Sequence, residues 1–191
     1  MSMVRFQISI SLDGYSAGPE QSEENPLGVG GEVNASTPVM EQAQANVGAT
    51  VMGRKMFGGG SGHWKEDPPW KGWWGENPPF HTPVFVLTHH EREPLEMEGG
   101  TTFFFATDGI EATLKQAEEA AGGMDVMISG GASVIQQYLA AGLVDEFWVH
   151  ITPIILGAGE RLLENVGDVQ VDQMQAIDAP GVTHIKYRVV K

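Results

Sequence analysis

The stretch from Asp125 to Gly159 constrains the fold more than any other part of the sequence. It begins with a short apolar run, Val126–Ile128, which is typical of a strand buried on both faces. Apolar side chains at helical spacing follow, and Gly142 stands where a helix C-terminus often requires a positive φ. Residues 144–151 then alternate like a second strand. The stretch predicts a strand–helix–strand unit with parallel strands and a right-handed crossover.

Gly130 and Gly131 directly follow the first of these strands and precede the helix. Glycines at this point let the backbone approach a ligand without interference from Cβ atoms. The helix N-terminus behind them offers unpaired N–H groups and the positive end of the helix dipole. Because open α/β sheets bind ligands at the carboxyl ends of parallel strands, the pair indicates an anionic cofactor. A tight turn without a ligand is the alternative.

The composition restricts the classes of function. The chain has 191 residues, no cysteine, and 25 acidic against 11 basic residues. The formal net charge of −14 argues against non-specific binding to nucleic acid or to anionic membranes. Without cysteine, disulfides, thiolate catalysis and cysteine zinc sites are absent. No apolar run reaches transmembrane length and the N-terminus lacks a signal-peptide pattern, so we expect one cytoplasmic domain over residues 1–191.

Alternation and turn signals predict the remaining elements. Residues 4–12 and 144–151 alternate as strands do, and in the second Phe147, Val149 and Ile151 alternate against Glu146, Trp148 and His150. The other expected elements are helices at 38–47, ended by Gly48, and at about 109–121, capped by Asp108 or Thr107, and strands at 49–52, 84–88, 101–106, 169–176 and 182–190. This order predicts a mixed α/β sheet with helices on both faces.

Positive charge follows a second strand end. Gly53-Arg54-Lys55 come after the strand at 49–52, and adjacent cations are informative in a chain with 11 basic residues. They indicate an anion site, with a solvated loop as the alternative. The strand at 84–88 is followed by His89 and His90. Neighbouring histidines on an extended chain point to opposite faces and no second cluster has ligand spacing, so we expect no metal.

Residues 58–83 hold four of the five tryptophans among glycines and prolines, which disfavour regular structure. Because indoles favour burial, we expect this Trp-rich segment to pack on the body of the protein or on a partner chain. An aromatic wall for a flat ligand is the alternative. Together with the apolar stretch TPIIL at 152–156, the segment predicts a homodimer.

Four motifs in this order resemble the dihydrofolate reductase-like superfamily, in the branch related to the reductase domain of the bacterial riboflavin-biosynthesis enzyme. They are SLDGYSAG, VMGRKMF, VFVLTHH and MISGGASVIQQYLAAGLVDEFWVHITPIILGAG, and they span nearly the whole chain. The resemblance implies a three-layer α/β/α fold around a mainly parallel sheet of about eight strands. It also implies NADPH and hydride transfer to a small heterocyclic substrate, pteridine- or pyrimidine-like.

The resemblance also implies residue roles for the cofactor. Arg54 would meet the adenosine 2′-phosphate, because a guanidinium suits a phosphate bidentately. The other implied cofactor residues are Gly53, Lys55, Thr88 and His89 near that phosphate, Ser129, Gly130, Gly131, Ala132 and Ser133 at the diphosphate, and Ser9, Ser16, Ala17 and Gly18 near the nicotinamide. In the resembled family the peptide equivalent to Gly130–Gly131 is cis.

The substrate side is less defined by the resemblance. His150 falls near a position whose side chain points into the substrate pocket of dihydrofolate reductase. Candidate proton donors are Asp13, Glu32, His150 and ordered water, and capping of a turn is the alternative role of Asp13.

Two features of the family lack a counterpart here. The region of Asn25–Thr37 and Glu41 offers no aligned carboxylate for a pteridine, and Gly58–Gly60 replace an acidic motif of the riboflavin branch. Two other classes of function therefore stay open beside a reductase. One is a non-catalytic NADP(H)-binding protein, and the other is an interaction module that uses the Trp-rich segment.

Overall fold

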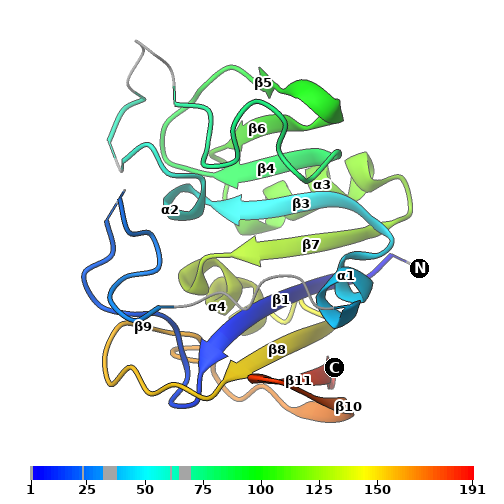
Figure 1. The fold of residues 1–191 in the computed structure, drawn as a ribbon. Coiled ribbons are helices and arrows are strands. Elements are labelled where there is room, and N and C mark those ends of the chain that lie inside the picture. The colour runs from blue at the N-terminus through cyan, green and yellow to red at the C-terminus, as the bar shows by residue number, and fades with distance from the viewer. Residues whose placement is uncertain (1, 23, 32–37, 61, 65–69) are drawn as a thin grey trace. The chain divides into compact units, whose positions relative to one another are not determined.

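The structure is a computed structural model that describes the chain except for residues 1, 23, 32–37, 61 and 65–69. The chain forms two compact parts (Figure 1). The first part contains residues 1–2 and 46–131, and the second contains residues 3–45 and 132–191.

The first part is built on five strands in the order β7–β3–β4–β6–β5. All neighbours are parallel except the last pair. Its elements are β3 (Val47–Gly53), α2 (Arg54–Phe57), β4 (Pro83–Leu87), β5 (Leu95–Glu96), the 3₁₀ turn η1 (Glu98–Gly100), β6 (Thr102–Ala106), α3 (Ile110–Ala121) and β7 (Asp125–Gly130). Figure 1 shows α3 behind β3 and β4, with the segment after α2 in front.

The second part has four strands in the order β10–β11–β8–β1, in which only β1 and β8 are parallel. A separate antiparallel ladder joins β2 and β9. Its elements are β1 (Val4–Ser11), β2 (Tyr15–Ala17), α1 (Pro38–Gln44), α4 (Ala132–Ala140), β8 (Glu146–Thr152), β9 (Glu160–Arg161), β10 (Val171–Ala179) and β11 (Val182–Val189).

The predicted fold class is confirmed: the described residues form a mixed α/β structure, in which β1 pairs in parallel with β8, β3 with β7 and with β4, and β4 with β6. The unit at 125–159 is present as β7, α4 and β8. The predicted end of the helix at 38–47 was wrong. Helix α1 ends at Gln44, because Asn46 adopts a left-handed φ of 66° and β3 already begins at Val47. The predicted caps of α3 were also wrong: its N-cap is Gly109, without a side-chain hydrogen bond.

Strand β8 is buried on both sides of its alternation. Glu146, Trp148 and His150 are only 5%, 6% and 0% exposed, so the polar side of the alternation is buried. Buried polar groups require partners. Glu146 has two, since Lys186 Nζ lies 2.6 Å from Oε2 and Arg188 Nη2 lies 2.9 Å from Oε1. Alternation separates the two faces of a strand but does not say whether the polar face is covered.

Candidate functional site

The strand register of the first part aligns the carboxyl ends of its parallel strands. Met52 of β3 pairs with Gly130 of β7, and Gly53 pairs with Leu87 of β4. Leu87 in turn pairs with Ala106 of β6. The residues that follow these strand ends therefore share one edge of the sheet, where parallel α/β sheets bind ligands.

Arg54 begins the short helix α2 at this edge, directly after β3. Its guanidinium carbon lies 3.0 Å from the centroid of the Trp64 ring, and Nη2 donates to the Gly59 carbonyl at 3.0 Å. Nε and Nη1 are buried without a hydrogen-bond partner among the described residues. Burial, and then the charge of Arg92, lower the pKa of Arg54 to about 10. The side chain is therefore still a cation at neutral pH, with unused donors that fit a phosphate.

Arg92 is a second cation at the same indole, and the sequence motifs did not identify it. Its guanidinium carbon lies 4.9 Å from the Trp64 ring centroid, and Nη1 donates to the Trp70 carbonyl at 2.8 Å. Burial lowers the pKa of Arg92. Its position shortly after the VFVLTHH motif was the signal that could have found it.

The polar residues after β4 take different positions. Thr88 is buried, its N–H donates to the Ala106 carbonyl at 3.0 Å, and its hydroxyl accepts from the His90 N–H at 3.2 Å. His89 and Lys55 are exposed. The rings of His90 and His63 lie 4.3 Å apart between centroids. Thr88 thus shapes the turn, while the exposed side chains can reach a ligand.

The turn after β7 is open. The Gly130–Gly131 peptide is cis, as predicted. A Cβ atom added at Gly131 would meet no protein atom within 4 Å, so there is room beside this backbone. Ser129 is half-buried before the turn. Ala132 is buried and Ser133 exposed in the first turn of α4.

In the second part, three neighbouring strands bring Ser9, His150 and His184 to one register level. The Nδ1 atoms of the two histidines lie 2.8 Å apart, and His150 Nε2 lies 3.2 Å from Gln7 Oε1. Burial, and then the neighbouring His184, lower the pKa of His150 to about 4. Burial also lowers the pKa of His184. At neutral pH both rings are uncharged.

Asp13 stabilises a turn. Its carboxylate accepts from the Ser11 hydroxyl at 2.6 Å and from the N–H groups of Leu156 and Gly157 at 3.1 and 2.7 Å. The hydrogen bond from Ser11, and then those from the Gly157 and Leu156 N–H groups, lower the pKa of Asp13 to about 2 against an opposing effect of burial. An anion held in this way favours the turn-capping alternative over proton donation.

The other predicted nicotinamide residues surround the β2–β9 ladder. The Ser16 hydroxyl donates to the Glu160 carbonyl at 3.1 Å. Ala17 is buried, and the Gly18 N–H donates to the Leu27 carbonyl at 2.8 Å. Ser9 Oγ, by contrast, is buried without a hydrogen-bond partner among the described residues. Glu32, the remaining candidate proton donor, lies outside the described residues.

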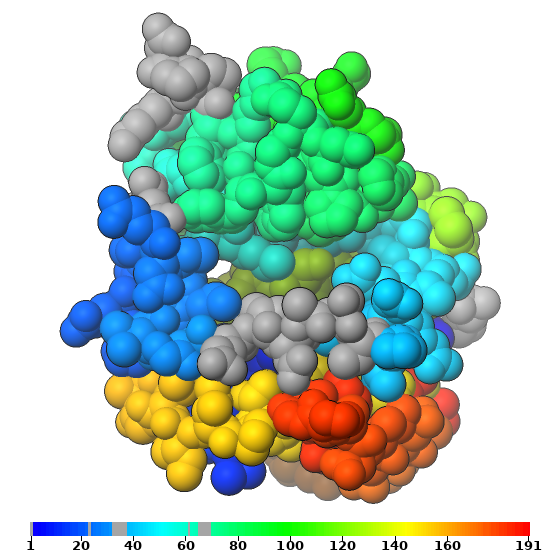
Figure 2. Space-filling model, viewed as in Figure 1, coloured from blue at the N-terminus to red at the C-terminus, as the bar shows by residue number. Residues whose placement is uncertain are grey.

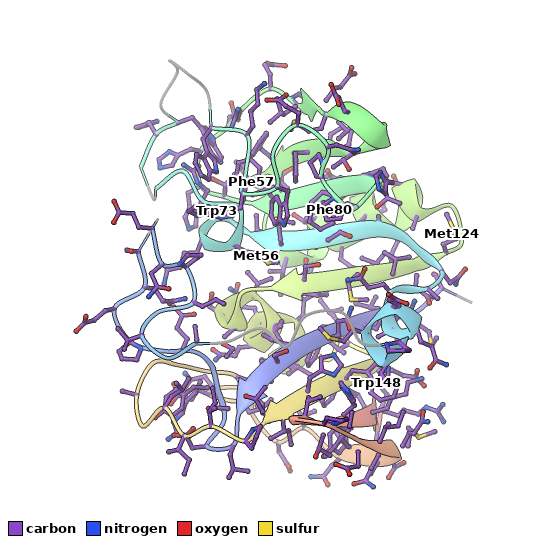
Figure 3. All side chains as sticks on the ribbon, in the orientation of Figure 1. Met56, Phe57, Trp73, Phe80, Met124 and Trp148 are labelled. Carbon is purple, nitrogen blue, oxygen red and sulfur yellow. The ribbon has the colours of Figure 1, made fainter. Side chains whose placement is uncertain are left out.

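The Trp-rich segment packs on the first part. Trp64, Trp70, Trp74 and Phe80 lie against the buried cluster Met52, Phe57, Val84, Val86 and Phe103. The indole N–H of Trp70 donates to the Phe57 carbonyl at 2.7 Å, and that of Trp64 to the His90 carbonyl at 2.9 Å. Figure 2 shows the green residues of this region as a close-packed surface, and Figure 3 labels Phe57, Trp73 and Phe80 near α2 and β4. The predicted packing on the body of the protein is confirmed for the described tryptophans.

Among the described residues, no cluster of three or more metal-ligating side chains is placed to hold an ion. Within the same residues, no helix has the length and apolar character needed to cross a membrane.

Comparison with solved structures supports the fold. A putative riboflavin biosynthesis protein from Shewanella sp. PV-4 has a TM-score of 0.70 at 21% identity, with 99% of both chains covered. Riboflavin biosynthesis reductase Rib7 of Saccharomyces cerevisiae reaches 0.57 at 15% identity, covering 100% of this chain and 89% of that one. Dihydrofolate reductase of Enterococcus faecalis, complexed with NADP(H), reaches 0.58 at 14% identity, covering 99% and 97%.

Comparison with protein sequences gives two further matches. YyaP of Bacillus subtilis, described as uncharacterized, is 30% identical over 95 residues. That match covers 48% of this chain and 50% of YyaP, about half the length of each. The model of the RibD C-terminal domain matches residues 2–186. The chain therefore belongs to the RibD C-terminal domain family.

Proposed function

We propose that the protein is an NADPH-dependent reductase of a small heterocyclic substrate, pyrimidine- or pteridine-like. The observation that carries the proposal is Arg54, a cation at the carboxyl end of β3 whose Nε and Nη1 lack partners among the described residues. The names of its relatives point the same way, since they include a riboflavin biosynthesis reductase and a dihydrofolate reductase complexed with NADP(H). When bound, NADPH would supply the hydride for the reduction.

The chain's own residues would bind and orient the cofactor. Arg54, with Lys55 and His89, would hold the 2′-phosphate, and Arg92 would add a second guanidinium close to it. The open backbone at Gly131 would allow the diphosphate to approach. The remaining proposed contacts are Gly53, Thr88, Ser129, Gly130, Ala132 and Ser133 along the nucleotide, and Ser9, Ser16, Ala17 and Gly18 near the nicotinamide.

Neither Asp13 nor His150, the two described side-chain candidates, is suited to donate a proton at neutral pH. With a pKa near 4, His150 is almost entirely unprotonated at neutral pH and acts as a neutral hydrogen-bonding group. Asp13 is an anion committed to its turn, with a pKa near 2. Ordered water and Glu32, which lies outside the described residues, are the candidates that remain.

The test is NADPH oxidation with a panel of pyrimidines, pteridines and small carbonyl compounds. We expect at least one pyrimidine or pteridine to be reduced, with NADPH preferred over NADH. Tight NADPH binding without turnover of any compound would favour a non-catalytic nucleotide-binding protein. Absence of NADPH binding, with a partner captured irrespective of nucleotide, would favour an interaction module.

We also propose a cytoplasmic homodimer. Because the described tryptophans of residues 58–83 pack within their own part, the remaining support is the exposed apolar surface at Leu12 and Ile155, which are 65% and 74% exposed. Sedimentation at micromolar concentration should give a dimer. A single 20.6 kDa species would contradict it.

A further inference from the structure

A chain of hydrogen bonds crosses the polar sheet face of the second part. It starts at the Met40 carbonyl of α1, which accepts from Gln7 Nε2 at 3.4 Å. Gln7 Oε1 lies 3.2 Å from His150 Nε2, and His150 Nδ1 lies 2.8 Å from His184 Nδ1. Both histidines are 0% exposed, so these contacts are not screened by solvent.

When both imidazole rings are neutral, these hydrogen bonds have only one consistent assignment of donors and acceptors. The Met40 carbonyl can only accept, so it orients the Gln7 amide with Nε2 toward α1 and Oε1 toward His150. His150 must then carry its proton on Nε2 and accept at Nδ1. His184 therefore carries its proton on Nδ1, which leaves a lone pair on Nε2.

This lone pair has no counterpart in the part of the chain that the structure describes. His184 Nε2 is buried and has no hydrogen-bond partner among the described residues. On the other side of His150, the hydroxyl of Ser9 is also buried and unpartnered among them. A buried acceptor left unpaired is destabilising, so a native protein normally provides a partner from solvent or from a ligand.

The charge state restricts that partner. Burial keeps the histidine pair uncharged at neutral pH. In the same row, Glu146 is ion-paired with Lys186 at 2.6 Å and with Arg188 at 2.9 Å, so these charges already have partners. An uncharged acceptor beside a hydroxyl does not suit phosphate or carboxylate, which would face a lone pair. It suits a neutral ring that presents an N–H or O–H group.

We propose that His184 is a substrate-binding residue, in which Nε2 accepts a hydrogen bond from an N–H or O–H group of a neutral heterocycle. The chain from Met40 through Gln7 and His150 fixes the unprotonated state of that nitrogen. Ser9, two strand spacings or about 10 Å away, offers a hydroxyl to the same ligand. The identity of this ligand as the reductase substrate rests on the proposed function; the tautomers and the binding chemistry do not.

The first experiment needs no variant. Nitrogen-15 NMR of the imidazoles at pH 7 distinguishes the two neutral tautomers of each of the 6 histidines. We expect His184 protonated on Nδ1 and His150 protonated on Nε2. A proton on His184 Nε2 would overturn the proposal, because that nitrogen could no longer accept.

The second experiment uses two matched probes that are both neutral at pH 7, 2-aminopyrimidine and 2-methoxypyrimidine, of which only the first has N–H donors. The first should shift the His184 Nε2 resonance and the second should not. His184→Asn should weaken 2-aminopyrimidine binding roughly tenfold, because the asparagine amide can still donate to His150 but has no equivalent of Nε2. Tyr187→Phe, also on β11, serves as the control with unchanged affinity.

Two further outcomes decide the matter. Gln7→Leu removes the acceptor of the His150 Nε2 proton and should allow His184 to populate the other tautomer. An unchanged His184 tautomer in this variant would refute the role of Gln7 in fixing it. Equal responses to both probes, or none at millimolar concentration, would mean that internal water satisfies His184 and would overturn the binding role. Loss of NADPH binding or turnover tests the reductase proposal alone, because neither NMR readout depends on the cofactor.

Discussion

Each part of the molecule contains a basic side chain with at least one buried nitrogen that lacks a partner among the described residues, Arg54 in the first and His184 in the second. Burial lowers the pKa of both. The starting values of 12.5 and 6.5 differ so much, however, that Arg54 remains a cation while His184 becomes neutral. An unpartnered buried nitrogen thus does not define its ligand by itself. The charge that survives burial does, and it indicates an anion for Arg54 and an uncharged donor for His184.

The surroundings of the two groups differ in the same sense. Arg54 lies on the Trp64 ring, above aromatic packing that includes Phe57 and Phe103. The histidines lie in a polar row, where neighbouring side chains hold one another by hydrogen bonds. The first part therefore positions its cation by apolar packing, and the second positions its neutral rings by directed hydrogen bonds.

The largest expected effect comes from breaking the packing of the first part. Phe103 is 0% exposed, with ring centroids 5.0 Å from Phe57 and 6.1 Å from Phe80. Phe103→Ala should lower the free energy of unfolding by about 3–5 kcal/mol, as measured by urea denaturation. Leu163→Ala, at a position 57% exposed, is the control and should change it little. Similar losses for both variants would show that the aromatic cluster is not the support of this part.

The next effect separates ligand space from protein packing. Gly131→Val adds a side chain whose Cβ meets no protein atom within 4 Å, so the unfolding free energy should change little. NADPH affinity should fall by at least about tenfold, or 1.4 kcal/mol, because the side chain fills the space assigned to the diphosphate. Calorimetric titration measures this loss. Normal NADPH binding by the variant would remove the diphosphate from this turn.

A third effect is the pH dependence contributed by the neutral histidines. The pKa of His150 falls from 6.5 to about 4 on folding, so the unfolded chain binds the proton more readily. Stability should therefore be fully retained above about pH 6.5 and decline as the pH falls toward 4. Asp13 and Glu146 also have lowered pKa values, from ordinary values of 3.8 and 4.5. Their contribution to stability is lost mainly below those pH values, so the decline just below pH 6.5 reports on the histidines.

Urea denaturation at several pH values between 6.5 and 4.5 measures the decline. His150→Asn should flatten it, whatever the variant does to stability at pH 7. If the pH dependence of stability is unchanged in the variant, folding does not lower the pKa of His150. The contrast between a neutral histidine and a charged Arg54 would then be lost.

The sequence was most informative where a signal is local. A strand end followed by Gly-Arg-Lys or by Gly-Gly is visible in a few residues, and the register of the first part brings both turns to one edge. Arg92 was missed because its link to Arg54 is the ring of Trp64, 28 residues earlier in the chain. His184 was missed because it pairs with His150 only across an antiparallel register between β8 and β11. Contacts set by strand order cannot be read from spacing along the chain.

The central claim, that Arg54 retains its charge in order to bind a 2′-phosphate, is tested most directly by titrating the protein and Arg54→Ala with NADPH and with NADH. The unaltered protein should prefer NADPH. The variant should lose about 1.5–3 kcal/mol of NADPH binding, as expected for a charge-assisted hydrogen bond, while NADH affinity barely changes. Equal losses for both cofactors, or no preference in the unaltered protein, would contradict the account.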